Sequence, residues 1–308
     1  MSPALASALA GGLALLLTPA LAAWARARGW IDRVEGGDAV RKPRSEPVPT
    51  VGGVAVVTAM AAAALLSGLS LPWMGLLGAL GLGVLDDLRP LGARQKLSGQ
   101  ALVALGLATD GYLQGWGTGS EWLLLIPIAL VAMNALNTWD HADGLASTTA
   151  LLGLAGPLPM GAAACAGFLP WNTLLRRGSD RGRAPVAYLG DGGSHALGAL
   201  VAWYPSAWPV LAVPLLDLAR VVWLRLAAGQ SAFVGDRRHF GQRLERAGLG
   251  PVPAAGVAAL CLLPASSLWI SSSAMLRGAL LGTSLGLYAW ALIAARGGRD
   301  PADACDGP

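Results

Sequence analysis

Long apolar runs separated by short polar segments dominate the chain. Seven runs can be delimited, at residues 3–23, 51–69, 71–85, 97–113, 122–138, 252–270 and 276–295. They approach the ~20 residues with which a helix crosses a bilayer, although some are shorter. Because backbone groups in hydrocarbon must be hydrogen-bonded within their own segment, the runs are predicted to be helices. The pattern therefore predicts an all-α, polytopic membrane bundle.

Composition agrees with a lipid environment. Hydrophobic residues make up 54% of the 308 residues and charged residues only 13%, whereas a soluble domain carries about 25% charged residues. A cleaved signal peptide is the alternative for residues 1–23. That run has no basic segment before it and its positive charges follow it, so we expect it to be retained as a span.

Positive charge is distributed unevenly. Basic residues gather at 26–44, 89–96, 176–183 and 220–246 and near the C-terminus, whereas the links near 70, 110–121 and 205 hold no Lys or Arg. Only Arg277 breaks this pattern. The positive-inside rule then places the N-terminus outside, and the basic loops and the C-terminus in the cytoplasm of a cell (inner or plasma) membrane. We expect a single transmembrane domain over residues 1–308 with about 10–11 membrane helices.

Two of these elements are expected to be abbreviated. About 28 apolar residues lie between Leu145 and the basic cluster at 176–183, yet two crossings would need ~40 residues and a turn. The segment "AGPLP" (155–159) combines glycine and prolines, which stop and reverse a helix. We therefore predict a short helical hairpin turning at Gly156–Pro157, and a similar turn around Pro205.

Polar motifs interrupt the apolar pattern at its predicted cytoplasmic side. These are Asp86 and Asp87 after the third run, "NALNTWDHADGLA" (134–146), "YLGDGGSHALG" (188–198) and "GQSAFVGDRRHFGQRL" (229–244). In the second motif, Asn134, Asn137, Asp140 and Asp143 recur at three-residue steps and would share a drifting helix face. Ionisable residues at membrane depth are functional candidates, although any one of them can simply solvate a helix end.

The residue types narrow the chemistry. Clustered carboxylates with three histidines in the whole chain favour a hard, oxygen-ligated cation such as Mg²⁺ over zinc. Nearby Arg and Lys side chains would hold phosphate oxygens, and the glycines of "GDGG" allow close approach of a ligand. Neither a Walker-type phosphate loop nor a dinucleotide fingerprint is present. This pattern predicts a phosphoryl-type transfer at the cytoplasmic membrane surface.

Taken together, the motifs resemble those of the polyprenyl-phosphate N-acetylhexosamine-1-phosphate transferases, glycosyltransferase family 4. The similarity runs, in the family's order, through "RGWIDRVEGGDAVRKPRSEPVPTVGG" (28–53), "DDLRPLGARQKLSGQ", "NALNTWDHADGL", "GFLPWN" (167–172), "LGDGGSHALG" and "PLLDLARVVWLRLAAGQSAFVGDRRHFGQRL". It covers residues 28 to about 245.

The resemblance implies a reaction. A phosphate oxygen of undecaprenyl phosphate would attack the β-phosphorus of a UDP-N-acetylhexosamine, with UDP-GlcNAc favoured by "SAF" before Asp236, and UMP would leave. Mg²⁺, for which Mn²⁺ could substitute, would offset charge on the diphosphate. A homodimer stays open.

The resemblance also implies residue roles. Asp86, Asp87 and Asp191 match the catalytic aspartates, with Asp191 and Asp86 at the metal. The implied substrate-binding residues are Thr50, Lys96, Asn137, Asp140, Asp143, Asp236, Arg237, Arg238 and His239.

Some features depart from the family pattern. One branch has His-x-His-His in the cytoplasmic loop, whereas here Gly241 and Gln242 stand in place of the later histidines. We expect histidines restored at these two positions to be tolerated or mildly activating. His141 replaces a family glycine and His195 follows the serine of the metal motif; each is a new ligand contact or a helix-end packing residue.

Other functions fit less well. A transporter would also place acidic residues inside a bundle, but it would not account for motifs on one side that alternate with Arg-rich loops. A non-catalytic homologue that acts as a membrane scaffold or regulator is the alternative, favoured by the reduced loop motif. Nucleic-acid binding is not expected, since the basic loops lack interleaved aromatic residues or a known module.

Overall fold

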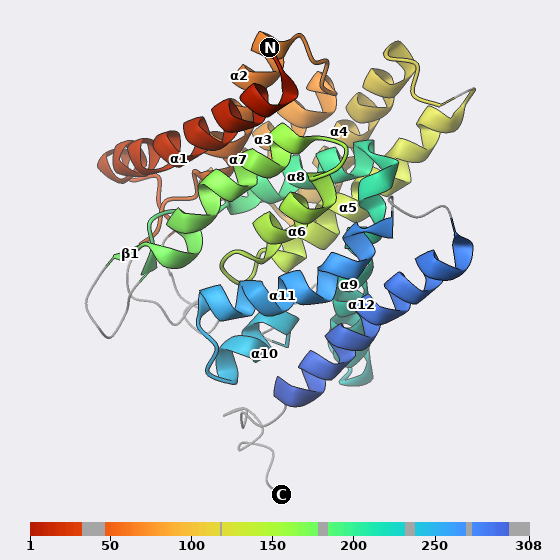
Figure 1. The fold of residues 1–308 in the computed structure, drawn as a ribbon. Coiled ribbons are helices and arrows are strands. Elements are labelled where there is room, and N and C mark those ends of the chain that lie inside the picture. Colours follow the sequence, from red (N-terminus) through yellow and green to blue (C-terminus); the bar gives the residue numbers. More distant parts are fainter. Residues whose placement is uncertain (33–46, 118, 178–183, 232–237, 269–272, 296–308) are drawn as a thin grey trace, which may run out of the picture.

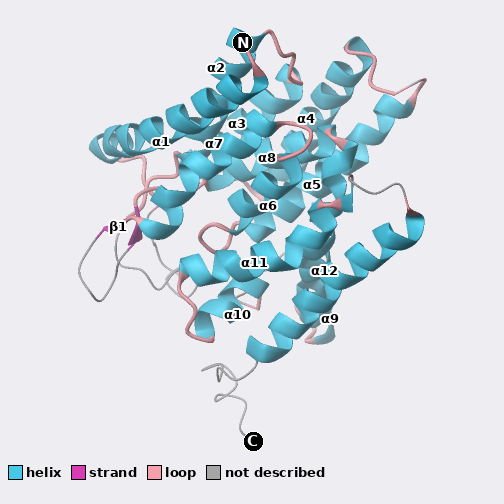
Figure 2. Cartoon of the chain, viewed as in Figure 1, coloured by secondary structure: helices cyan, strands magenta, loops and turns pink. Residues whose placement is uncertain are grey.

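The structure is a computed structural model that describes residues 1–32, 47–117, 119–177, 184–231, 238–268 and 273–295. Within these ranges the chain is almost entirely helical (Figures 1 and 2). The α-helices are α1 (Pro3–Arg28), α2 (Gly52–Ser67), α3 (Trp73–Leu88), α4 (Ala93–Leu113), α5 (Leu125–Trp139), α6 (Leu145–Leu154), α7 (Pro159–Leu169), α8 (Gly190–Trp203), α9 (Ala212–Ala227), α10 (Phe240–Arg246), α11 (Pro251–Ser266) and α12 (Ala274–Ala294). Shorter elements are the 3₁₀-helices η2 (Glu121–Leu124) and η4 (Pro205–Leu211), the π-helix η3 (Pro170–Leu174), and the antiparallel strands β1 (Arg176–Arg177) and β2 (Ala184–Pro185).

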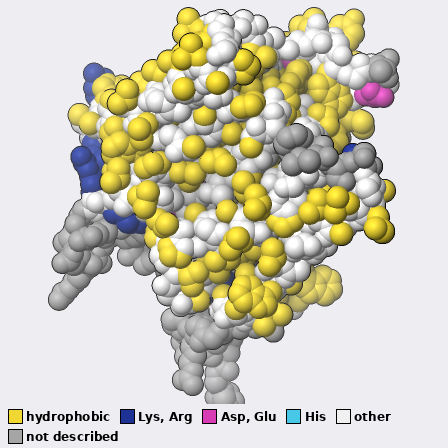
Figure 3. All heavy atoms as spheres, in the orientation of Figure 1, with side chains coloured by type: hydrophobic (Ala, Val, Ile, Leu, Met, Phe, Trp, Pro, Cys, Tyr) yellow, Lys and Arg dark blue, Asp and Glu magenta, His cyan; other side chains and the backbone are white. Residues whose placement is uncertain are grey.

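The all-α membrane class is confirmed. Among the described residues, three helical segments are long and apolar enough to cross a membrane, at Pro3–Arg28, Glu121–Trp139 and Ala274–Ala294, and α2, α6 and α11 are shorter apolar helices. Figure 3 shows a face that is largely apolar, with most of its Lys and Arg side chains gathered along one edge. Such an extended apolar surface is typical of a face that meets lipid. The count of 10–11 spans and the inside–outside orientation stay predictions.

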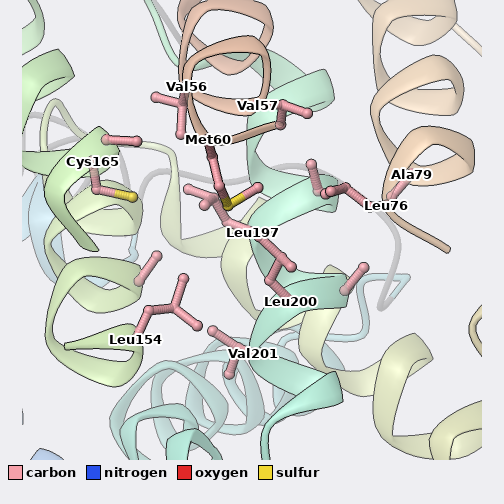
Figure 4. Close-up of a cluster of buried hydrophobic side chains, with 14 of the residues drawn as sticks. Val56, Val57, Met60, Leu76, Ala79, Leu154, Cys165, Leu197, Leu200 and Val201 are labelled. Atoms are coloured by element: carbon pink, nitrogen blue, oxygen red, sulfur yellow. The ribbon is translucent and has the colours of Figure 1, made fainter. Parts of the chain in front are cut away.

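Helix α8 lies at the centre of the bundle and packs against α2, α3 and α5. Met60, Leu76, Leu197 and Leu200 belong to the buried core around it (Figure 4). The approach of α3 to α8 depends on Gly83, because a Cβ there would overlap the backbone of Asp191 and Gly192. This contact brings the last turn of α3 to the first turn of α8.

The predicted short hairpin is confirmed. Helix α6 has 10 residues and α7 has 11, and the turn between them contains Gly156 and Pro157. Its arms are covered by protein, since α7 packs against α1 and α2 while α6 packs against α8 and α11. That cover is what a non-spanning hairpin at membrane depth requires.

The second predicted turn also lies where expected. Helix α8 ends at Trp203, and Pro205 begins a new helix after the extended residue Tyr204. The chain after this turn does not form the short second arm of a hairpin. A seven-residue 3₁₀-helix, η4, leads instead into the 16-residue helix α9.

Several helix ends differ from the predicted runs. Helix α3 continues to Leu88, so the paired aspartates lie in its last turn, and α4 already begins at Ala93. The prediction that Asn134, Asn137, Asp140 and Asp143 share one helix face is wrong for the last two, because α5 ends at Trp139. The chain turns there because Gly144 has a φ of 86°, a left-handed conformation that favours glycine, and its N–H donates to Asn172 Oδ1 at 2.6 Å.

Candidate active site

A cluster of carboxylates surrounds the ammonium group of Lys96. Its Nζ lies 2.7 Å from Asp86 Oδ2 and 2.5 Å from Asp191 Oδ2. Asn137 joins the cluster, since its Nδ2 donates to Asp191 Oδ1 at 2.7 Å and its Oδ1 accepts from Lys96 Nζ at 3.3 Å. Four helices, α3, α4, α5 and α8, thus each supply one polar side chain to the same point.

Asp87 anchors the start of α8. Its two oxygens accept the backbone N–H groups of Asp191, at 3.1 Å, and Gly192, at 3.2 Å. These amides belong to the first turn of a helix, where N–H groups lack partners within the helix and favour an anion. Gly190 permits this approach with a φ of 77°, and a Cβ there would crowd Asp87 Oδ2 and Thr50. Asp87 therefore holds the backbone that presents Asp191.

Thr50 lies beside the same turn. The segment around it pairs with the residues before α8, since the N–H of Gly52 donates to Tyr188 O at 2.9 Å and that of Gly53 to Leu189 O at 2.8 Å. The hydroxyl of Thr50 accepts a hydrogen bond from Trp30 Nε1 at 3.0 Å. The structure therefore brings together six of the predicted residues: Thr50, Asp86, Asp87, Lys96, Asn137 and Asp191.

The donor set at Lys96 fits a hard cation. Asp86 Oδ2, Asp191 Oδ2 and Asn137 Oδ1 all lie within 3.3 Å of the positively charged Nζ. Carboxylate and amide oxygens are suitable ligands for Mg²⁺, which often uses one or two carboxylates and completes its shell with water and phosphate. The described residues contain no group of three or more His, Cys, Asp or Glu arranged to hold a metal. A Mg²⁺ ion at this cluster would therefore complete its shell with water or phosphate oxygens.

A second cluster surrounds His239, which is 5% exposed. Its Nδ1 lies 3.0 Å from Asp217 Oδ2, on α9. Asp217 also accepts from Tyr288 Oη on α12 at 2.8 Å and from Arg220 Nη2 at 2.7 Å. Asp217, Arg220 and Tyr288 are not among the residues predicted for the site. A lone acidic residue inside the apolar run of α9 was the signal that could have found Asp217.

The two unexpected histidines are engaged by the protein itself. His195 is fully buried; its Nδ1 donates to Asp191 O at 2.7 Å and its Nε2 lies 3.0 Å from Gln100 Nε2. His141 Nδ1 donates to Thr138 O at 2.6 Å, and its Nε2 accepts the N–H of Gly241 at 3.1 Å. Both residues are therefore packing residues with satisfied nitrogens.

The environment of His141 keeps its ring neutral. Burial and the neighbouring His239 lower the pKa of His141 from 6.5 to about 4. The neutral ring retains the lone pair with which Nε2 accepts the Gly241 N–H.

The expectation that histidine at position 241 would be tolerated is wrong. A Cβ on Gly241 would lie 2.5 Å from Ala142 Cβ and 2.8 Å from Leu145 Cδ2. Ala142 Cβ is fixed by the backbone, so it cannot move aside as the end of a flexible side chain could.

The remaining predicted residues lie outside the Lys96 cluster or outside the described ranges. Asp143 forms an ion pair with Arg176 at 2.8 Å, and Asp140 is the half-buried C-cap residue that follows α5. The backbone carbonyl of Arg238 accepts from Arg220 Nη2 at 2.5 Å. Asp236 and Arg237 lie outside the described residues.

Comparison with known proteins finds similarity to one family and to enzymes with closely related names. Residues 69–207 match glycosyl transferase family 4. The chain is 29% identical over 251 residues to an undecaprenyl-phosphate alpha-N-acetylglucosaminyl 1-phosphate transferase of Yersinia pestis, covering 68% of each chain. It is 27% identical over 283 residues to a decaprenyl-phosphate N-acetylglucosaminephosphotransferase of Mycobacterium leprae, covering 68% of this chain and 71% of the relative. An Escherichia coli K12 protein with the same name as the Yersinia relative is 28% identical over 205 residues, covering 54% of this chain and 55% of its own.

Proposed function

Because residues 69–207 match glycosyl transferase family 4 and the relatives are named for this chemistry, we propose that the chain is a member of this family, transfers an N-acetylhexosamine 1-phosphate to undecaprenyl phosphate and releases UMP. The donor is a UDP-N-acetylhexosamine, with UDP-GlcNAc favoured because the relatives are named for N-acetylglucosamine. The reaction takes place at the cytoplasmic face of the cell membrane, where it would begin a cell-envelope polysaccharide.

The observation that carries this proposal is the convergence of Asp86 and Asp191 on Lys96. A diphosphate needs both a cation between its oxygens and further positive charge around it. The cluster offers oxygen donors for the first and a lysine for the second. It lies at the ends of α3, α4, α5 and α8, where a nucleotide from water can meet a lipid phosphate.

Each residue then has a definite task. Asp86 and Asp191 would hold Mg²⁺, or Mn²⁺ in its place, which when bound supplies charge stabilisation on the diphosphate. Lys96 releases its carboxylates as the substrate binds and pairs with phosphate oxygens instead. Asp87 keeps the first turn of α8 in place, and Asn137 fixes the orientation of the Asp191 carboxylate through its amide.

The remaining motif residues serve the nucleotide sugar. We assign Asp140 and Asp143 to that side of the site, Thr50 to its entrance, and Asp236, Arg237, Arg238 and His239 to the cytoplasmic loop motif that would bind the diphosphate. Arginine suits this place because its planar guanidinium binds phosphate oxygens in pairs.

The test is a transfer assay with purified protein. Mg²⁺, undecaprenyl phosphate and a panel of UDP-sugars are supplied, and UMP release is measured together with the lipid product. We expect release with a UDP-N-acetylhexosamine, and none when either the lipid or the metal is omitted. Failure of a folded protein with every donor would instead favour a non-catalytic scaffold.

A further inference from the structure

His141 links two segments that lie 100 residues apart in the chain. Its ring accepts the N–H of Gly241, in the first turn of α10, and donates to the carbonyl of Thr138, near the end of α5. A carbonyl oxygen can only accept, so Nδ1 carries the proton and Nε2 carries the lone pair. Both nitrogens of His141 are thus used by the backbone, which leaves neither for a ligand.

The same contact lies against His239. The ring centroids of His141 and His239 are 4.8 Å apart. His239 immediately precedes α10, and its own Nδ1 is held by Asp217. The N–H of Phe240 also donates to Asp217, at 3.2 Å. The backbone that carries His239 is therefore fixed at two adjacent amides, that of Phe240 by Asp217 and that of Gly241 by His141.

Aromatic packing completes this attachment. The ring of Phe240 stacks on Trp139 with centroids 5.4 Å apart and an interplanar angle of 3°. The Phe240 ring also lies against the ring of Tyr288, with centroids 5.2 Å apart. Trp139 is the last residue of α5 and His141 lies in the turn that follows it, so one short segment holds α10 by a ring and by a hydrogen bond.

His141 also fills space that a larger residue at position 241 would need. A Cβ on Gly241 would lie 3.0 Å from His141 Nε2, which is tighter than an ordinary contact. His239 is thus the histidine supplied by the cytoplasmic loop motif, and the imidazole of His141 lies beside it from the turn after α5.

We propose that His141 is a positioning residue, which holds the first turn of α10 so that His239 faces the nucleotide sugar. This inference rests on the proposed function, because it assigns His239 to substrate binding. His141 acts through the backbone N–H of Gly241 and through its ring contact with His239, and does not itself touch the substrate.

Three substitutions separate the parts of this role. His141→Phe keeps a ring but removes the acceptor, whereas His141→Gln keeps an amide oxygen that can accept from Gly241. We expect His141→Phe to lower kcat/KM for the UDP-sugar about tenfold, as for the loss of one hydrogen bond, and His141→Gln to stay within about threefold of the wild type. Trp116→Phe is the control, since it removes a comparable bond to Trp203 O, at 2.9 Å, outside this cluster.

Combination with His239→Ala tests whether His141 acts through His239. If it does, adding His141→Phe to His239→Ala lowers kcat/KM by less than about twofold, because coupled residues are not additive. An additive loss, or a His141→Gln variant as impaired as His141→Phe, would overturn the proposal.

A measurement without turnover distinguishes this proposal from the proposed function. Hydrogen exchange of the amides in residues 239–246 should be faster in His141→Phe than in the wild type, and unchanged in His141→Gln and Trp116→Phe. Unchanged exchange in His141→Phe would refute the positioning role whatever the assay shows. A wild-type protein that turns over no UDP-sugar, but shows the expected exchange, would refute the proposed function alone.

Discussion

The Nζ atom of Lys96, on α4, lies 2.5 Å from Oδ2 of Asp191, in the first turn of α8. The same ammonium lies 2.7 Å from Asp86 Oδ2, on α3. One lysine thus pairs with carboxylates from two other helices, and the charge balance of the candidate site depends on it.

Lys96→Gln tests this balance. Without the ammonium the two carboxylates face each other, and a phosphate loses its positive partner, so we expect UMP release to fall by about 100-fold or more. Mg²⁺ alone should raise the Tm of Lys96→Gln more than that of the wild type, because a bound cation relieves the repulsion. Arg94→Gln is the control, since Arg94 lies exposed in the same first turn of α4. Equal Tm shifts in wild type and Lys96→Gln would contradict a cation position at Nζ.

Asp87→Ala tests the anchor of α8. The substitution leaves the N–H groups of Asp191 and Gly192 without their acceptor, which should lower the free energy of unfolding by about 1–3 kcal/mol and displace Asp191. We expect a lower Tm together with a loss of UMP release.

Asp110→Ala provides the matched control for this effect. Asp110 Oδ2 accepts the N–H of Gly75 at 2.9 Å, at the other end of α3 from Asp86. The Asp110→Ala substitution should lower the Tm as Asp87→Ala does, but leave the kcat/KM of the folded protein close to that of the wild type. If Asp87→Ala changes only the Tm, Asp87 has no influence on the reaction.

Much of the fold could be predicted because lipid leaves few choices for the backbone. Apolar runs became helices, and Gly156 with Pro157 marked the short hairpin. Helix ends were less predictable. Asp86, Asp87 and Lys96 have charges that end an apolar run, but a charged side chain at the membrane surface does not end a helix, so α3 and α4 extend through them.

The Lys96 cluster could be predicted in part and the His239 cluster hardly at all. Asp86, Asp191 and Asn137 belong to recognisable motifs, whereas Tyr288 meets Asp217 across 71 residues of sequence. His141 and Gly241 are 100 residues apart, and neither residue alone indicates that one supplies the acceptor for the other. Such pairings are decided by tertiary packing, which a single sequence does not display.

The acid sensitivity of stability follows from His141. Its pKa is about 4 in the folded protein and near 6.5 when exposed, so between these values the unfolded chain binds the proton first. This contribution to stability is complete above about pH 6.5 and declines as the pH falls towards 4. His239, Asp217 and Arg220 are the charged or titratable neighbours that influence it.

A comparison with His141→Gln isolates this contribution, because glutamine does not titrate. As the pH is lowered from about 7 to about 5, the Tm of the wild type should fall relative to that of His141→Gln. A Tm difference that stays constant over this interval would mean that His141 has the pKa of a freely exposed histidine in the folded protein.

Cysteine labelling tests the inside–outside orientation. Arg177 and Ser120 are exposed and suit a reporter cysteine. Cys165 and Cys261 are buried, so in a Cys305→Ser background the introduced cysteine is the one expected to react. We expect Arg177→Cys to react only from the cytoplasm and Ser120→Cys only from the exterior. Reaction of both from one side would contradict the predicted topology, because β1 follows the hairpin that must return to the cytoplasmic face.

Transfer by the wild type and by Asp191→Asn, in the same lipid and detergent and at equal folded concentration, tests the central claim most directly. UMP release is measured with Mg²⁺, undecaprenyl phosphate and UDP-GlcNAc. We expect release by the wild type and a loss of about 1000-fold or more in Asp191→Asn, with Tm and monodispersity retained, because charge stabilisation by a metal supplies several kcal/mol. Equal release by both proteins would remove Asp191 from the chemistry and contradict the assignment of the Lys96 cluster as the active site.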